Sequence, residues 1–376
     1  MKKILLAVMA IVVTAGSLVA QAPKWKKGIL VDEFVFEKTS FPESHAATIA
    51  ETPKGLVAAW FGGTKERNPD VGIWVSHHQN GKWTAPVEVA DGKINDTLRY
   101  ACWNPVLYQV PGGDLMLFYK IGPNVAGWTG WLKTSKDGGH TWSQARALPK
   151  GFLGPVKNKP VLLPGGELFC ASSTEGNGWK VHFEVTRDFG KTWEKIGPIN
   201  DGKTFNAIQP SLLTHQDGRL QILCRSKSRA ILESWSSDGG RTWSPLAVAK
   251  LPNNNSGTDA VSLKDGRQLL VYNHVLPPEG QPKGLRTPLN VAVSRDGKNW
   301  EAALVLEDSP ISQYSYPAVI QTSDGLVHIL YTWRRERIRH VVVDPKKLKT
   351  EKIRNGIWPG ATPKPAQSQA SVREEG

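Results

Sequence analysis

The stretch SSDGGRTW, Ser236–Trp243, decides the fold because it recurs along the chain. Near-copies end at Trp142 (SKDGGHTW) and Trp193 (TRDFGKTW), a shortened copy ends at Trp300 (SRDGKNW), and a weaker relative ends at Trp83 (SHHQNGKW). Successive tryptophans are 59, 51, 50 and 57 residues apart, a period long enough for one four-stranded sheet per repeat. Five marked units and the unmarked C-terminal part predict about six repeats.

Short apolar runs alternate with turn signals between these loops. Examples are GLVAAWFGG (55–63), DLMLFYKIG (114–122), RLQILCRS (219–226) and LVHILYTW (326–333), which are rich in branched and aromatic residues and bounded by Gly, Asn or Asp. Helical periodicity is scarce. The sequence therefore predicts an all-β chain folded as a propeller, because radial repetition of blades hides the edges of its sheets.

The repeated loop itself predicts structure rather than chemistry. Its Asp and Ser oxygens can accept hydrogen bonds from nearby backbone N–H groups, its glycines allow positive φ, and its Trp can pack beneath the turn. We expect each copy to hold a hairpin within a blade. Its acidic residues are too few for a calcium cage of the EF-hand kind.

The two ends of the chain differ in composition from the repeats. Residues 1–22 have the pattern of a signal peptide, with two lysines, an apolar run and a small-residue cleavage site, so we expect an exported protein, periplasmic or secreted, without stable membrane insertion. Residues 23–350 are assigned to the propeller. Residues 351–376, which end in a stretch rich in Pro, Gln and Ser, are assigned to a disordered tail.

Charge and cysteine content narrow the possible partners. The formal net charge is +13, or +11 once Lys2 and Lys3 leave with the signal peptide, which favours anionic partners. The basic residues are dispersed and no nucleic-acid-binding motif is present, so nucleic acid is not the expected partner. For an exported protein, the expected anionic partner is an acidic glycan. The three cysteines have no zinc-like or redox spacing, and we expect buried thiols. No motif requires a metal or an organic cofactor, and the oligomeric state is left open.

The recurring loops resemble the Asp-box, or BNR, repeats of the sialidase superfamily, whose fold is a six-bladed β-propeller. The resemblance covers roughly residues 28–345 and implies an exo-α-sialidase-type glycoside hydrolase. In that family three arginines hold a sugar carboxylate, a tyrosine with a glutamate partner acts as nucleophile, and an aspartate is the acid/base; a tyrosine nucleophile is an exception among retaining glycosidases.

Several residues match this pattern. Arg225 follows an apolar strand like the family's second arginine, and Arg286 precedes a strand that leads into a box like the third. Two guanidinium groups could fork around one carboxylate. Tyr316, eight residues before an Asp-Gly turn, matches the nucleophile, with Tyr314 as the alternative. Asp70 matches the acid/base, with Glu66 and Arg67 beside it as groups that could tune it or contact substrate.

Two positions depart from the family. ESHAATIAE places His45 where the first arginine is expected, and NAIQPSLL places Gln209 where the glutamate is expected. Gln209 can orient a substrate or Tyr316 by hydrogen bonding but cannot accept a proton at neutral pH. His45 can act as an acid or a base near neutrality. The chemistry therefore has room to differ from that of a sialidase.

Further polar residues lie at strand ends that a propeller gathers at its axial mouth. The candidate pocket residues are Asn104, Lys159, Asn255 and Asp259, with Lys157, Glu175 and His182 in other polar stretches. A basic strand carries Arg334, Arg335, Arg337 and Arg339 as a solvated edge or an extra anion site.

Three functional hypotheses remain open. The first is a hydrolase that removes a terminal acidic sugar, with Asp70, Tyr316, Arg225 and Arg286 in the family's roles. The second is a uronate-directed lyase or rhamnosidase-like propeller in which His45 is the base and a tyrosine the acid. The third is a carbohydrate-binding propeller without catalysis. The sugar, the linkage and the choice between hydrolysis and elimination are not determined by the sequence.

Overall fold

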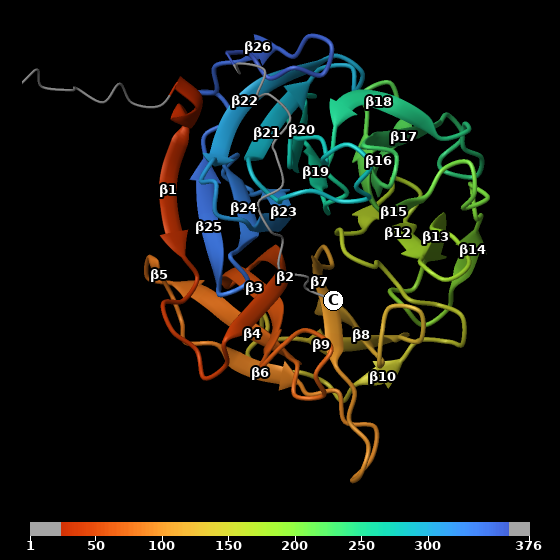
Figure 1. The fold of residues 1–376 in the computed structure, drawn as a ribbon. Helices are drawn as coiled ribbons and strands as arrows, with labels where there is room; N and C mark the ends of the chain where they lie inside the picture. The colour runs from red at the N-terminus through yellow and green to blue at the C-terminus, as the bar shows by residue number, and fades with distance from the viewer. Residues whose placement is uncertain (1–23, 361–376) are drawn as a thin grey trace, which may run out of the picture.

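The computed structural model describes residues 24–360, which form six β-sheets arranged as blades around one axis (Figure 1). The predicted six-bladed, all-β propeller is confirmed, with one short 3₁₀ turn, η1 (Lys24–Lys26), before the first strand. The proposed signal peptide lies outside the described residues.

Each blade is an antiparallel sheet whose first strand lies nearest the axis (Figure 1). The first blade contains β2 (Glu43–Thr52), β3 (Gly55–Gly63), β4 (Gly72–Gln79), β5 (Lys82–Trp83) and β6 (Val87–Ala90). The second contains β7 (Cys102–Gln109), β8 (Leu115–Ile121), β9 (Thr129–Ser135) and β10 (Arg146–Ala147). The third contains β11 (Val161–Leu162), β12 (Leu168–Thr174), β13 (Lys180–Thr186) and β14 (Glu194–Ile196).

The other three blades follow the same order. The fourth contains β15 (Ala207–Thr214), β16 (Leu220–Ser226), β17 (Ala230–Ser236) and β18 (Ala247–Pro252). The fifth contains β19 (Asp259–Ser262), β20 (Gln268–Tyr272), β21 (Leu289–Ser294), β22 (Trp300–Glu307) and β26 (Glu351–Lys352). The sixth contains β23 (Tyr314–Gln321), β24 (Val327–Trp333), β25 (Arg337–Val343) and β1 (Ile29–Phe34).

The N-terminal strand closes the ring. β1 pairs with β25 from Ile29 opposite Val343 to Phe34 opposite Arg339, so the sixth blade takes its outer strand from the start of the chain. β26 adds to the outer edge of the fifth blade, and the buried Trp358 lies 5.5 Å from Trp25 between ring centroids. Residues 351–360, assigned to the tail by composition, therefore pack on the propeller, and the rest of that tail lies outside the described residues.

The core lies between neighbouring blades. Every blade supplies strands that are buried on both faces, such as β8 (LMLFYKI) and β20 (QLLVY), which explains why their sequences are continuous apolar runs rather than alternating ones. Cys102, Cys170 and Cys224 are buried free thiols within these strands, and burial raises the pKa of each thiol. The thiols act as core residues.

The Asp boxes are built as the sequence predicts. In the fourth blade, Asp238 accepts hydrogen bonds from the Thr242 N–H and hydroxyl and from the Ser236 hydroxyl, and these bonds lower its pKa to about 2. Trp243 Nε1 donates to the carbonyl of Gly240, 2.9 Å away. The copies centred on Asp137 and Asp188 repeat these contacts with Ser or Thr partners, and in the shortened copy Asp296 accepts hydrogen bonds from Ser294 and Asn299. The weaker copy at Trp83 is instead a two-residue hairpin turn through Asn80 and Gly81, both at positive φ.

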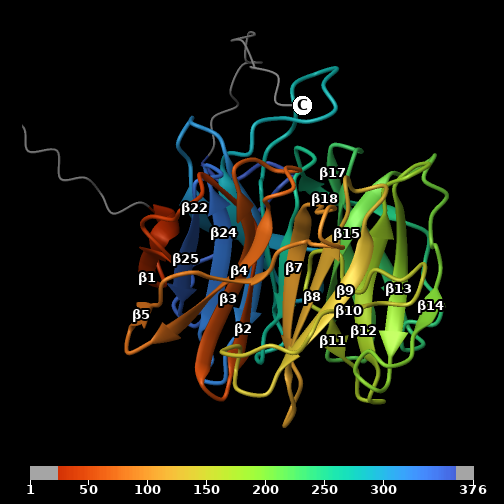
Figure 2. The same ribbon diagram turned by 90° about the horizontal axis from the view of Figure 1, so that it is seen from below.

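The strand register places the Asp boxes at one end of the propeller and the starts of the inner strands at the other end. In the fourth blade Leu220 pairs with Ser236 beside the box, whereas Arg225 pairs with Ile208 at the other end of β16. A strand rises about 3.3 Å per residue, so the two ends are separated by roughly 20 Å. The side view in Figure 2 shows these two loop-bearing faces. The boxes are therefore remote from the end at which the inner strands begin.

Candidate functional site

A β-bulge near the start of the inner strands directs polar side chains toward the axis. The register shifts in β2, β7, β15 and β23 contain Ala46, Asn104, Gln209 and Tyr316, all of them non-glycine residues at positive φ. Such a conformation is uncommon for these residue types and is found where a bulge re-aims a side chain. The same local device in four blades thus delivers three predicted site residues to one end of the axis.

Tyr316 is the centre of the resulting group. Its phenol oxygen accepts hydrogen bonds from Arg225 Nη1 at 2.8 Å and from Gln209 Nε2 at 3.2 Å. The ring lies 4.2 Å from the His45 ring between centroids. We call Tyr316, Arg225, Arg286, Gln209, His45 and Lys157 the axial cluster. Tyr314, the alternative tyrosine, is buried in the core beside Trp333, so the geometry favours Tyr316.

Arg225 and Arg286 flank the Tyr316 ring, with their guanidinium carbons 5.8 and 5.4 Å from its centroid. Arg225 also donates from Nε to Asn255 Oδ1, and Arg286 donates from Nη1 to Gln313 Oε1. Among residues 24–360, neither guanidinium has a carboxylate partner. Burial lowers the pKa of Arg286 to about 10, and Tyr316 opposes that shift, so the side chain remains charged at neutral pH. Two half-buried cations therefore converge here, and within residues 24–360 neither forms an ion pair.

Gln209 acts as a hydrogen-bonding group beside Tyr316. Its amide nitrogen faces the Tyr316 oxygen, and its amide oxygen lies 3.5 Å from Arg225 Nη1. Because Gln209 and Arg225 both donate to the phenol oxygen, the site stabilises negative charge on that oxygen but offers no base at this position.

His45 is buried and held in one orientation. Its Nδ1 lies 2.8 Å from the Thr332 hydroxyl, which also accepts the backbone N–H of Ala46. This contact anchors the ring through Nδ1, and within residues 24–360 Nε2 has no hydrogen-bond partner. Burial, followed by the charges of Arg335, Arg286, Lys157 and Arg225, holds the pKa of His45 well below its usual range. The imidazole is neutral at neutral pH.

Two lysines precede β11, and Lys157 Nζ lies 5.6 Å from the centroid of the Tyr316 ring. Lys157 Nζ donates to Asn158 Oδ1 and to the carbonyls of Thr258 and Pro317, and burial lowers its pKa to about 7. Lys159, a predicted substrate ligand, instead forms an ion pair with Asp259 at 3.0 Å. Asp259 also accepts hydrogen bonds from Ser211 and from the Val319 N–H, so this pair joins four blades. Lys159 and Asp259 thus connect neighbouring blades, whereas Lys157 lies beside Tyr316 in the axial cluster.

Asp70 and Arg67 lie in the β3–β4 loop. The two carboxylate oxygens of Asp70 accept the N–H and the hydroxyl of Thr64 at 2.7 and 2.8 Å, as a turn-capping aspartate does. Arg67 is exposed at φ 81° and makes no side-chain hydrogen bond within the described part of the chain. Glu66 in the same loop forms an ion pair with Arg335 from the β24–β25 turn. The catalytic role of Asp70 and the binding role of Arg67 stay predictions.

Three further groups lie near the axial cluster, and the sequence predicts no catalytic role for them. Arg335, in the β24–β25 turn, is a charged neighbour of both His45 and Arg286; the solvated edge that the sequence suggested for this basic stretch is not found, because β25 pairs with β24 on one side and β1 on the other. Trp179 lies 5.3 Å from Arg225 and 4.6 Å from Lys227, and Glu175 is in the same hairpin. A polar turn joining two buried strands, SSTEGNGW, was the available signal. Which loops face the axis at this end depends on blade register, which a single sequence does not define.

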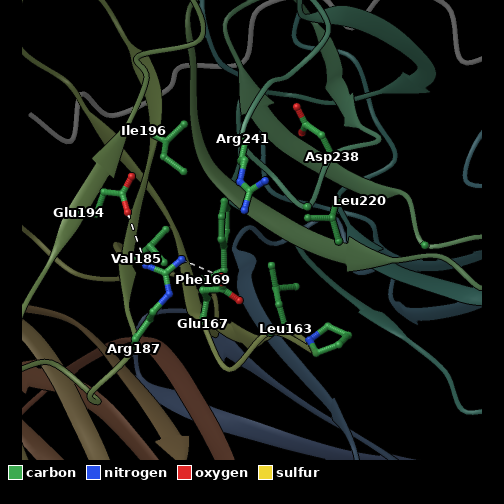
Figure 3. A pocket seen from close by; sticks show the side chains of 14 residues that line it. Leu163, Glu167, Phe169, Val185, Arg187, Glu194, Ile196, Leu220, Asp238 and Arg241 are labelled. Atoms are coloured by element: carbon green, nitrogen blue, oxygen red, sulfur yellow. Dashed lines mark hydrogen bonds and ion pairs between the residues drawn. The ribbon is translucent and has the colours of Figure 1, made fainter.

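A separate hollow lies on the opposite face, between the third and fourth blades (Figure 3). Phe169, Leu163 and Leu220 form its apolar side, the Asp238 turn borders it, and Arg187 is bridged to Glu167 and Glu194. Because its lining comes from the box end of the strands, it is distinct from the axial cluster.

A six-bladed propeller with arginines and a tyrosine gathered on its axis belongs to the sialidase-like class of BNR-repeat folds. The family model for the BNR repeat-like domain matches residues 54–329, and the chain belongs to this family. None of the curated protein sequences compared with the chain matches it.

Solved structures share this fold at low sequence identity. A protein of unknown function from Dyadobacter fermentans is 15% identical, with a TM-score of 0.67 over 86% of this chain and 100% of its own. The NanB sialidase from Streptococcus pneumoniae is 13% identical, with a TM-score of 0.64 over 84% of this chain and 71% of its own. An alpha-L-arabinanase from Penicillium chrysogenum is 17% identical, with a TM-score of 0.63 over 85% and 99%. The fold therefore hosts glycosidases with different sugars.

Proposed function

We propose that this chain is an exported exo-glycosidase of the sialidase-like type that removes a terminal acidic sugar from a glycan. The observation that carries the proposal is the pair of half-buried guanidinium groups, Arg225 and Arg286, which flank Tyr316 and form no ion pair with a carboxylate of residues 24–360. Charged donors in fork geometry suit a sugar carboxylate. The N-terminal sequence pattern supports export.

In this proposal Tyr316 faces the reacting carbon as nucleophile or charge stabiliser. Arg225 and Gln209 donate to its oxygen and so stabilise the negative charge that it needs for either role. The glutamate of the family pattern is replaced by Gln209, and an arginine by His45. These two exchanges favour an acidic sugar other than sialic acid, such as a uronate.

The testing experiment is a panel of acidic oligosaccharides, sialosides and uronides, incubated with the purified protein and assayed for released monosaccharide. Release of one terminal acidic sugar is expected, and Tyr316→Phe and Arg286→Met should each reduce it. A protein that binds these glycans but consumes none is a carbohydrate-binding propeller, and that result would refute the hydrolase.

Elimination at a uronate is a second candidate, favoured by the neutral His45 ring 4.2 Å from Tyr316. A neutral imidazole can take the proton next to the sugar carboxylate, while Tyr316 protonates the leaving oxygen and the arginines neutralise the carboxylate. The same panel read by ultraviolet absorbance distinguishes the reactions, because only elimination forms an unsaturated product. Under elimination, His45→Ala should abolish turnover.

A further inference from the structure

The β12–β13 hairpin is fastened to the axial cluster on both sides. At the end of β12, the Ser173 hydroxyl accepts the backbone N–H of Gln209 at 3.1 Å. At the start of β13, the Trp179 ring lies 5.3 Å from the guanidinium carbon of Arg225, and Trp179 N–H is held by Asn206 Oδ1 at 3.0 Å. Glu175 lies in the turn between these two anchors, two residues after Ser173.

The surroundings of Glu175 are mixed in charge. Arg225 and Lys227 are the cations, and Glu66 the anion, whose charges act on it, and within residues 24–360 its side chain has no hydrogen-bond partner. Burial raises the pKa of Glu175, Glu66 adds to this, and the two cations oppose it. The carboxyl group therefore holds its proton to a higher pH than an exposed glutamate does.

Three other candidate carboxylates are already engaged. Asp70 accepts two hydrogen bonds from Thr64, Glu66 pairs with Arg335, and Asp259 pairs with Lys159. Within residues 24–360 Glu175 forms neither a turn-capping bond nor an ion pair, so its carboxyl group can donate a proton to substrate without first breaking such a contact. Carboxyl groups whose environments differ in this way commonly divide acid and base roles.

We propose that Glu175, rather than Asp70, is the acid that protonates the leaving oxygen; this rests on the proposed glycosidase function. As the glycosidic C–O bond breaks, its electron pair goes to the leaving oxygen, which takes the Glu175 proton and departs as an alcohol. Tyr316 faces the positive charge on the sugar carbon. A water molecule then adds to that carbon and returns one proton to the Glu175 carboxylate, so the net reaction consumes one water.

The test compares two substrates that carry the same acidic sugar, one on an alcohol and one on nitrophenol. Nitrophenol leaves without protonation, so an acid variant loses activity mainly on the alcohol glycoside. Glu175→Gln is expected to lower kcat on the alcohol glycoside at least 100-fold and on the nitrophenyl glycoside less than tenfold, in line with typical general-acid contributions of about 10²–10⁴. It should also remove the fall in activity at high pH. Glu279→Gln, which removes an exposed charge from the neighbouring 275–285 loop, is the matched control.

Each outcome either supports or refutes the role of Glu175. Equal losses on both substrates, or the leaving-group pattern in Asp70→Asn instead, refute the role of Glu175 and leave the glycosidase proposal standing. A wild-type protein that consumes neither substrate refutes both. If Glu175→Gln does not fold by circular dichroism, Glu175→Asp keeps an acid on a shorter arm and must show the same dependence on the leaving group.

Discussion

Arg225→Lys is the perturbation that most directly tests the anion grip. Arg225 donates from Nε to Asn255 and from Nη1 to Tyr316 and Gln209, which fixes the plane of its guanidinium group. A lysine ammonium keeps the charge but has no planar fork, so it can replace one of these contacts and cannot present two parallel donors to a carboxylate.

The magnitude follows from the contacts that are lost. One charge-assisted hydrogen bond is worth about 1.5–3 kcal/mol, and each 1.4 kcal/mol is about tenfold, so kcat/KM should fall roughly 10- to 150-fold. The loss should appear in binding as well, as a raised Kd for the free acidic sugar measured by calorimetry.

The control is Arg229→Lys in the β16–β17 turn, where within residues 24–360 the guanidinium group donates one hydrogen bond, to the carbonyl of Pro278. Both variants should keep the wild-type melting temperature within a few degrees. If Arg225→Lys lowers kcat/KM less than twofold on an acidic substrate, or lowers it equally on a neutral analogue, Arg225 does not hold the carboxylate.

Three further outcomes are expected. Gln209→Glu places a proton acceptor beside the Tyr316 oxygen, so turnover of a hydrolysed glycoside should rise at least tenfold, and an unchanged or lower kcat in a steady-state assay would contradict this reading of the tyrosine. Burial lowers the pKa of His274 and of His328 to about 4 from the ordinary 6.5. Between these values the unfolded chain binds more protons than the folded one, so stability is lost as the pH falls. The unfolding free energies from urea titrations at pH 7 and pH 4 should differ by about 3 kcal/mol per histidine, and His328→Gln should reduce this difference. Trp243→Ala removes a ring stacked 4.4 Å from Phe183 and should cost about 3 kcal/mol of unfolding free energy while kcat/KM stays within twofold, because the box lies at the remote end of the blade.

The fold could be predicted because its signals are local. Each Asp box contains, within eight residues, its own hydrogen-bond donors and acceptors and the tryptophan that packs against the turn. Four copies at even spacing therefore reveal the blades without any knowledge of distant contacts. The closure of the ring by β1 and the addition of β26 left no comparable signal, because edge pairing is made through backbone groups that every residue has.

The site was predicted only in part. Tyr316, Arg225, Gln209, Arg286 and His45 come together on the axis, as the family resemblance implied. Lys157 and Lys159 are two residues apart, and spacing alone could not distinguish their roles. Lys157 lies beside Tyr316 in the axial cluster, whereas Lys159 pairs with Asp259. The direction of a side chain in an irregular segment depends on backbone geometry that the spacing of residue types does not reveal.

By itself, the sequence determined the repeating unit of this protein: SSDGGRTW and its copies, the buried strands between them and hence a propeller. Only the tertiary structure decided that the boxes lie at one end and Tyr316, flanked by Arg225 and Arg286, at the other. The physical reason is that hairpin chemistry is satisfied within a few residues, whereas the axial charges and the burial of His45 and Glu175 arise from separate blades that meet only when the ring closes.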